Sequence, residues 1–450
     1  MAEPVPKPPR PLARLAGALL SAVLLLAAAL LWWAGQTTSF VNWALARAVA
    51  ASNGALQVGA ARGTLLDGVR VERLAWRDAE REIELRGVSL AWRPAALLGS
   101  CLHFTRIEVA SVSIRLPGEA SAPALPPSLA LPLEVAVDAL GVGELQLVQP
   151  AQAPFELRRL AFSGRYAGGA YRVVHLSADA PRWGEARLEG RIGDGAPFAL
   201  ELTARLAPRL QGWGPLPQVR VLADGTLDDF AVAAQALPPP GASDAQAPAP
   251  VWIGLDTRVR PFAERLAQRF APIELTLDAV EPAQLGLAGA PRARFNGSAT
   301  IRVGDAQLEG RLALRNALPG PVDRRALPLA AIETGFAVSP TRLTLTGLHA
   351  TPAGGGTLTG AASVDLERQR VLFGRSLPEI ATQLALRDVD LSQLASGLAR
   401  TRLSGTVKVD GTTFDLDLAD PTRRGISASA LARIDAMQLR VERARLETPA

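Results

Sequence analysis

The chain has 450 residues, a formal net charge of +5 and 48% hydrophobic residues, a composition typical of a packed protein rather than a disordered one. Its basic residues are nearly all Arg and are spread between Asp and Glu along the chain. They do not form the clustered basic face with aromatics that binds nucleic acid, so we expect no nucleic-acid partner. The single cysteine, Cys101, excludes an intramolecular disulfide.

The N-terminal region predicts a membrane anchor. A basic, proline-rich tail covers residues 1–14, and an uncharged apolar run of about the length that spans a bilayer covers residues 15–34. The predicted ends of the anchor are Leu15 on one side and Trp32, Trp33 and Ala34 on the other. The basic flank places the N-terminus in the cytoplasm and the bulk of the chain beyond the membrane. A cleaved signal peptide is the alternative, which the bulky Trp pair disfavours because cleavage needs small residues.

Residues 35–54 predict a juxtamembrane helix. Thr38 or Ser39 is suited to cap its start, and the helix should run to about Ala51. Asn53-Gly54 provides the stop signal. We expect this helix to lie just outside the bilayer and to cover the first strands.

The next stretch repeats one apolar spacing, i, i+2, i+5, i+7, first at Val69, Val71, Leu74 and Trp76. A helix would scatter these side chains around its axis, and a regular strand would split them between two faces. A strand with one bulge keeps all four on one face, because the bulge absorbs one residue. The spacing therefore predicts bulged, strongly twisted strands with a single apolar face.

Two further copies follow directly, and together the three copies are the predicted lining of an apolar groove. The second and third copies are Ile83, Leu85, Val88 and Leu90, with Trp92 beyond, and Ile107, Val109, Val112 and Ile114, with Leu116 beyond. More copies occur at residues 135–142, 155–162 and 384–391, and weaker ones at 343–348 and 439–446. Residues 55–235 are thus predicted as the first part of the groove.

The rest of the chain also contains repeated strand-like patterns. A second repeated unit occurs at residues 186–192 and 306–312, and more loosely at 356–360, which favours an elongated stack of strands. A Pro/Ala-rich loop is predicted at residues 236–250, and the groove is predicted to continue over 251–450, where the strand-like end suggests a truncated protein. Local expectations are a helical turn at 94–99, a helix at 261–270 and a hairpin turn at Asn296-Gly297.

The sequence contains no pattern that predicts catalysis, a metal site or a cofactor. His103, His175 and His349 lack partners at metal-binding spacing, and neither a nucleophile elbow nor a phosphate-binding loop is present. The carboxylates at 415, 417 and 420 suggest a cation site, although a polar strand face is the favoured interpretation. We expect a protein that is not an enzyme.

A sheet with one apolar face must cover that face. It can close into a sandwich or barrel, or fold into an open gutter. Small interior residues and an aromatic content of 5% favour an accessible interior. An apolar gutter behind a membrane anchor is suited to hold acyl chains, because each buried methylene contributes about 0.8 kcal/mol.

The start of the chain resembles the TamB family within the AsmA-like superfamily. The residues that carry the resemblance are the anchor, Gly63-x-Leu65-x-x-Gly68-Val69-x-Val71-x-x-Leu74, and Leu90-x-Trp92-x-Pro94-x-x-Leu97-Leu98. The phrases Leu386-x-x-Val389-Asp390-Leu391-Ser392-x-Leu394 and Leu403-Ser404-Gly405-Thr406 resemble the wider superfamily. The likeness is specific over residues 15–116, and the C-terminal domain of the family is not recognised.

The resemblance implies a mainly β fold: an N-terminal transmembrane helix, then an elongated, twisted, antiparallel or mixed sheet curled into a hydrophobic groove (a β-taco), with a few short helices. It implies a single-pass inner-membrane protein whose periplasmic part moves phospholipid toward the outer membrane and assists outer-membrane protein assembly with a TamA-like barrel partner. Two alternatives stay open. One is a scaffold that binds nascent outer-membrane strands through its sheet edges, and the other is a set of ordinary β-sandwich domains.

Overall fold

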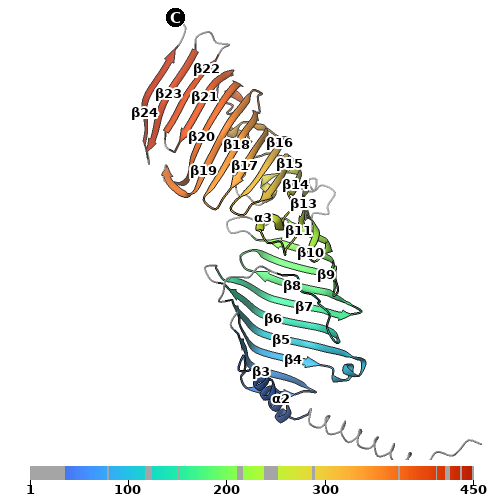
Figure 1. The fold of residues 1–450 in the computed structure, drawn as a ribbon. Coiled ribbons are helices and arrows are strands. Elements are labelled where there is room, and N and C mark those ends of the chain that lie inside the picture. Colours follow the sequence, from blue (N-terminus) through green and yellow to red (C-terminus); the bar gives the residue numbers. More distant parts are fainter. Residues whose placement is uncertain are drawn as a thin grey trace, which may run out of the picture. The chain divides into compact units, whose positions relative to one another are not determined.

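A computed structural model describes residues 36–78, 81–116, 124–149, 153–209, 216–237, 252–285, 289–372, 375–411, 413–420, 426–435 and 438–447. The fold is mainly β, with 65% strand and 9% helix, and its mostly antiparallel sheet is not closed (Figure 1). The fold class predicted from the sequence is confirmed at this level. The predicted tail and anchor, residues 1–14 and 15–34, lie outside the described residues. Within the described part, we find no helix with the length and apolarity to cross a membrane.

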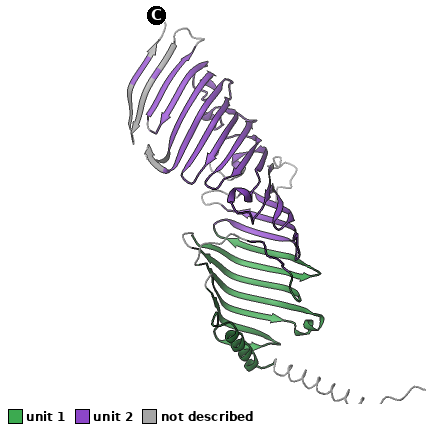
Figure 2. Ribbon diagram, in the orientation of Figure 1, with its two compact units in different colours: residues 1–121, 130–181 green, residues 122–129, 182–450 purple. Residues whose placement is uncertain are grey.

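The chain divides into two compact units (Figure 2). Unit 1 comprises Met1–Ser121 and Ala130–Pro181, and unit 2 comprises Ala122–Leu129 and Arg182–Ala450. The predicted Pro/Ala-rich loop at residues 236–250 lies mostly outside the described residues. On either side of that segment the strands are paired with each other, so the segment connects neighbouring strands of unit 2.

Unit 1 is a ladder of strands with one helix at its first edge. Its elements are α2 (Thr38–Ala51), β1 (Leu56–Val58), β2 (Ala61–Thr64), β3 (Gly68–Arg77), β4 (Glu82–Trp92), η1 (Pro94–Gly99), β5 (Cys101–Arg115), β6 (Glu134–Val148), β7 (Phe155–Ala167) and β8 (Ala170–Ala180). From β3 to β8 each strand pairs with the next, and only the β5–β6 pair is parallel.

The helix α2 covers the edge of this ladder, as the sequence predicted. Strands β1 and β2 pair in turn with the two ends of β3, and α2 packs against both of them, with Val41 buried. The cap differs by one residue from the prediction, because the Thr37 side chain accepts the Phe40 N–H at 3.3 Å. Asn53 and Gly54 adopt the left-handed backbone conformation expected of a helix stop.

Unit 2 is a longer antiparallel ladder in which consecutive strands pair from β9 to β24. Its elements are β9 (Gly184–Gly193), β10 (Ala199–Pro208), β11 (Gln218–Thr226), β12 (Asp229–Leu237), β13 (Trp252–Val259), α3 (Leu266–Arg269), β14 (Ile273–Val280), η2 (Pro282–Leu285), β15 (Phe295–Val303), β16 (Leu308–Asn316), η3 (Val322–Arg324), β17 (Leu329–Val338), β18 (Arg342–Pro352), β19 (Thr357–Leu372), β20 (Arg375–Val389), η4 (Leu391–Gln393), β21 (Leu403–Asp410), β22 (Thr413–Asp420), β23 (Ile426–Asp435) and β24 (Gln438–Glu447).

Two local predictions in unit 2 are wrong. The helix expected over residues 261–270 is only the four-residue α3. Asn296-Gly297 is not a hairpin turn but lies inside β15, and the hairpin comes later, between β15 and β16. The reason is tertiary: the Asn296 side chain accepts the Ala279 N–H of the preceding strand at 2.8 Å, and Gly297 closes onto the backbone of β16.

Much of the buried core of unit 2 lies at one edge of its ladder, whereas Phe198 is buried at the opposite edge, just before β10. The strands β14, β16, β18, β20 and β22 all end at the first edge, and three of the most buried side chains, Val280, Pro352 and Val389, stand at their last residues. The connecting loops bond to one another there: the Leu327 N–H donates to the Arg292 carbonyl at 3.3 Å, and the Val322 N–H donates to the Leu394 carbonyl at 2.9 Å. Linked loops therefore seal this edge.

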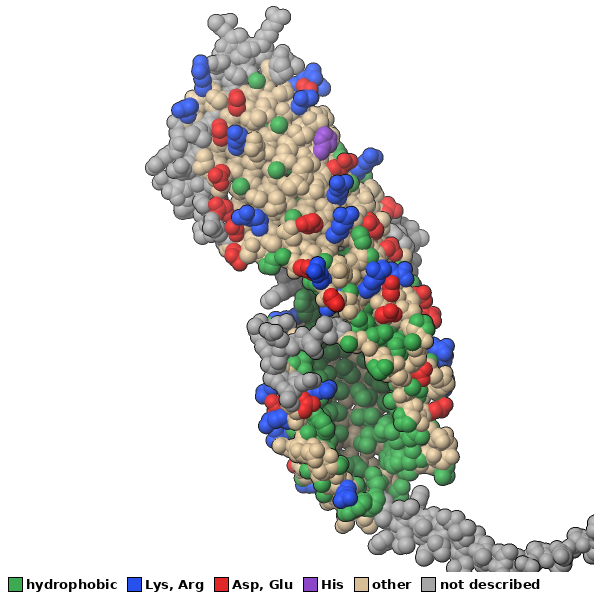
Figure 3. Space-filling model, in the orientation of Figure 1, with side chains coloured by type: hydrophobic (Ala, Val, Ile, Leu, Met, Phe, Trp, Pro, Cys, Tyr) green, Lys and Arg blue, Asp and Glu red, His purple; other side chains and the backbone are tan. Residues whose placement is uncertain are grey.

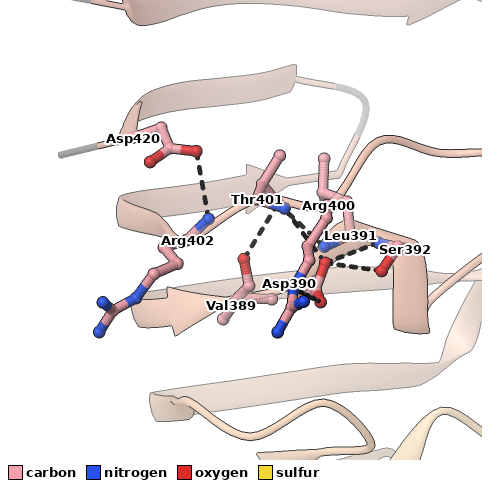
Figure 4. A network of polar contacts seen from close by, with 8 residues as sticks. All are labelled: Val389, Asp390, Leu391, Ser392, Arg400, Thr401, Arg402 and Asp420. Atoms are coloured by element: carbon pink, nitrogen blue, oxygen red, sulfur yellow. Dashed lines mark hydrogen bonds and ion pairs between the residues drawn. The ribbon is translucent and has the colours of Figure 1, made fainter. Parts of the chain in front are cut away.

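Asp390 organises the loop that follows β20 (Figure 4). Its carboxylate accepts the N–H and hydroxyl of Ser392, at 3.0 and 2.9 Å, and the Thr401 N–H at 3.1 Å. The buried Asp420 accepts the neighbouring Arg402 N–H at 3.2 Å. Burial alone would raise the pKa of Asp390, but the hydrogen bonds from Ser392 and Thr401, together with nearby Arg400, lower this pKa below its usual value.

This network predicts an acid-sensitive loop. A lowered folded-state pKa means that Asp390 stabilises unit 2 above the unfolded-state pKa of about 3.9 and loses that contribution as the pH falls through the lower folded value. We expect the Asp390→Asn variant to melt at a lower temperature than the native chain at pH 7. The difference between their melting temperatures should shrink as the pH is lowered below about 4. Calorimetric scans at several pH values measure it, and a difference independent of pH would contradict the assignment.

Candidate functional site

The apolar residues of unit 1 line up in rows across its strands. Residues paired directly in a sheet share a face, and the pairs of unit 1 join apolar residues from strand to strand. One row is Val69, Leu90, Ile107, Leu140, Phe162 and Leu176; a second is Leu74, Leu85, Val112, Leu145 and Leu157; a third is Trp76, Ile83, Ile114, Leu147 and Phe155. The three predicted copies are therefore brought together as neighbouring strands in register.

In the first three copies the three-residue step has a physical cause that differs from the predicted bulge. Both residues within the step point outward: in β3, Glu72 forms an ion pair with Arg62 at 3.6 Å, and Arg73 forms one with Glu84 at 2.9 Å. Because Arg73 pairs with Arg86, the extra residues Glu72 and Gly87 lie opposite each other. A bulge would leave one of them unmatched. Here β3 and β4 each carry one extra residue at the same position, so their register is preserved. The copies at residues 135–142, 343–348 and 384–391 do show a register shift at this step, as predicted.

The extra residue recurs at the corresponding position in β5, β6 and β7. The pairs that flank it place Ala110, Gly143 and Arg159 at corresponding positions, and Gly87 and Arg159 both have positive φ angles, of 62° and 51°. At this level the strands approach so closely that a Cβ on Gly143 would lie 2.6 Å from the Ala110 carbonyl oxygen. A shared kink in five adjacent strands keeps the apolar rows on one face.

Most predicted lining residues are only half-buried. Of the fourteen, Val71 and Val109 are buried, at 6% and 7% exposed, and Trp76 is 37% exposed. The other eleven are intermediate. In a packed sandwich the central rows would be the most buried part of the domain. These values instead describe an apolar surface that no second layer of the described chain covers.

Figure 3 shows a hollow lined by hydrophobic side chains in unit 1. We refer to this hollow, formed by the three rows above, as the trough. Its six strands, β3 to β8, give five inter-strand steps of about 4.8 Å, or about 24 Å along the stack. One leaflet of a bilayer is about 15 Å of hydrocarbon, so an acyl chain from a leaflet fits within the trough.

The opposite face of unit 1 is charged and solvated. Arg77 and Glu82 are hydrogen-bonded, and Arg115 lies 3.9 Å from Glu82. The hydrogen bond from Arg77 lowers the pKa of Glu82, and that from Arg86 lowers the pKa of Glu84. These ion pairs lie outside the trough and keep the two faces of each strand chemically distinct.

The structure also extends the trough beyond the residues singled out from the sequence. Trp92 pairs with Phe104, and this row continues through Val137 and Gly164 to Val173. Near the end of the ladder Tyr166 and Tyr171 pair, with ring centroids 4.7 Å apart. Val137 lies in the predicted copy at residues 135–142, whereas Phe104 and Val173 belong to no i, i+2, i+5, i+7 copy and were not predicted. The alternation of Leu102 with Phe104 and of Tyr171 with Val173 is the signal that indicates them.

The polar candidates do not assemble into a site. His103 lies 2.9 Å from Asp138, and His175 lies 3.0 Å from Ser177, as pairs on the surface of strands. Asp420 is buried as a backbone acceptor, whereas Asp415 and Asp417 are exposed. The described residues contain no group of three or more His, Cys, Asp or Glu placed to hold a metal ion.

Other concavities in the described part lie on strand faces with polar or charged side chains. One, in unit 2, is lined by Thr300, Arg311, Gly335 and Thr346 at a position where glycine leaves a gap in the polar row. Its walls are strand side chains without a convergent set of donors. The trough in unit 1 is therefore the candidate functional site.

No family model, curated protein or solved structure matches the chain.

Proposed function

We propose that the protein is a TamB-like, single-pass inner-membrane protein that shields lipid acyl chains in its periplasmic trough during phospholipid transport toward the outer membrane. The observation that carries this proposal is the half-buried state of the apolar rows in unit 1. A surface of this kind gains free energy when acyl chains cover it, at about 25 cal/mol per Å² of apolar area removed from water.

The two faces of the strands suit this task. A phospholipid tail would lie along the trough, and its polar head would remain in water at the open side, because the transfer of a charged head group into an apolar site is strongly unfavourable. Unit 2 would shield acyl chains in the same way, because its central pairs, such as Leu255 with Leu275 and Val407 with Leu416, are also apolar. The anchor at residues 15–34 would hold the trough at the membrane.

Site-specific photocrosslinking in cells tests this function. A photoreactive residue at Leu85 or Val112, which pair across β4 and β5 in the trough, should capture phospholipid. The same probe at Glu84, one residue along β4 and on the charged face, is the matched control and should capture far less. Capture at Glu84 with none at Leu85 or Val112 would refute a lipid-binding trough. Crosslinks to outer-membrane proteins would instead support the scaffold alternative.

A further inference from the structure

Unit 1 leaves large apolar side chains exposed on α2 and η1. Trp43 of α2 is 62% exposed, and Leu97 and Leu98 of η1 are 43% and 94% exposed. Single exposed hydrophobic residues are common on soluble proteins, so exposure by itself assigns nothing. Here the exposed residues belong to two elements that the fold joins at one corner.

Contacts at the ends of β2 and β4 form this corner. The helix α2 packs on β1 and β2, and the Leu65 carbonyl in the turn after β2 accepts the indole N–H of Trp92 at 2.5 Å. Trp92 is the last residue of β4, and η1 begins two residues later. Phe40 stacks on Trp43 with ring centroids 5.5 Å apart, which holds the Trp43 side chain on the surface of α2. The corner is therefore a fixed part of unit 1.

The charge of the corner fits a lipid surface. No acidic residue occurs between positions 35 and 66 or between 89 and 103, whereas both segments contain arginine, at Arg47 and Arg93. Exposed Trp and Leu on segments that carry Arg and no carboxylate of their own is the composition of elements that lie in the interface of a membrane. The acidic residues Asp67 and Glu134 lie at the ends of these segments, beside Thr64 and Ser100. The ion-paired outer face of β3, β4 and β5 differs in carrying both signs of charge.

The chain also limits how far this corner can lie from the apolar run. Only residues 35–37 separate Ala34 from Thr38, the first residue of α2. Four extended steps span at most about 14 Å. If residues 15–34 lie in the bilayer, as the proposed function requires, α2 is confined to the layer next to the lipid head groups.

We infer that the corner formed by α2 and η1 is a docking surface for a phospholipid bilayer, with Trp43, Leu97 and Leu98 seated among the lipid head groups. This contact would hold the first strands of the trough against the membrane. It rests on the membrane anchoring in the proposed function, but not on the binding of lipid within the trough.

Fluorescence quenching in vesicles tests this docking surface. The full chain carrying Cys101→Ser receives one new cysteine, Leu98→Cys, labelled with an environment-sensitive dye and reconstituted into vesicles of phosphatidylethanolamine and phosphatidylglycerol. Nitroxide-labelled lipid should quench this dye about threefold more than a dye at Val174→Cys, because interfacial elements enter the head-group region by about 5–10 Å. Val174 is the matched control, since it is apolar, 58% exposed and in the same unit.

Equal quenching at the two positions would overturn the docking surface. Both substitutions replace exposed side chains, and a second probe at Trp43→Cys, expected to behave like Leu98→Cys, guards against a local disturbance of η1. Weak quenching at both corner positions together with phospholipid capture at Leu85 would reject the docking surface and leave the proposed function intact. Strong quenching at the corner without phospholipid capture at Leu85 would support the docking surface and reject the binding of lipid in the trough.

Discussion

The Val112→Arg variant is expected to lose most phospholipid capture by the trough. Val112 lies in the middle of an apolar row, between Leu85 and Leu145. An arginine there places a charge in the path of the acyl chain, and such a charge costs about 2.5–3.5 kcal/mol at the centre of an apolar membrane segment. Since about 1.4 kcal/mol corresponds to a factor of ten, capture by a photoreactive residue at Leu85 should fall by roughly 60-fold to 300-fold.

The Ser113→Arg variant is the matched control for this experiment. Ser113 is the next residue of β5, pairs with Glu84 and shares the charged face, where a new arginine meets a carboxylate and solvent. Its lipid capture should remain near that of the native chain. If Val112→Arg captures lipid as well as Ser113→Arg does, the trough is not the lipid path. Retained assembly of outer-membrane proteins in both variants would then favour the scaffold.

The Gly360→Ala variant is expected to destabilise unit 2 by about 2–4 kcal/mol. Gly360 lies within β19 with a φ of +155°, and a Cβ there would lie 2.0 Å from the Gln383 carbonyl oxygen of β20. Such a separation is impossible without a shift of one strand, and the conformation is unfavourable for any residue with a side chain. The midpoint of thermal unfolding, measured by calorimetry, should fall by several degrees.

Gly397 provides the control, because it lies in the loop after β20 and a Cβ there would meet no atom within 4 Å. Its replacement by alanine should change the midpoint by less than about one degree, as expected for an unconstrained surface position. A midpoint for Gly360→Ala close to that of Gly397→Ala would show that β19 and β20 do not approach as closely as described.

Gly360 belongs to the repeated unit recognised in the sequence, and its close approach to β20 explains why the unit contains glycine. Its copies at residues 186–192, 306–312 and 356–360 share a glycine at the same place, at Gly190, Gly310 and Gly360, and each of these glycines meets the backbone of a neighbouring strand. The sequence indicated that the unit recurs. It did not indicate that glycine is required for close approach, because the register that sets the backbone of the adjacent strand opposite the glycine is not contained in the local pattern.

The failed local predictions share this cause. Asn296-Gly297 has the composition of a hairpin turn, but its strand continues because Asn296 bonds to the preceding strand. The apolar spacing of residues 261–270 suggested a helix, yet the segment forms only α3. In both places contacts between strands prevail over local preference, which contributes about 1 kcal/mol or less per residue.

The sequence by itself determined that the chain is mainly β, that the copies from Val69 to Leu116 each present one apolar face, and that a helix lies within residues 35–54 and ends at Ala51. These features follow from periodicity and capping, which depend on residues close together in the chain. Only the tertiary structure decided that the extra residues of neighbouring strands align in one kink and that the apolar rows of unit 1 stay half-covered. Register and coverage depend on which strands become neighbours, and a one-dimensional pattern does not contain that information.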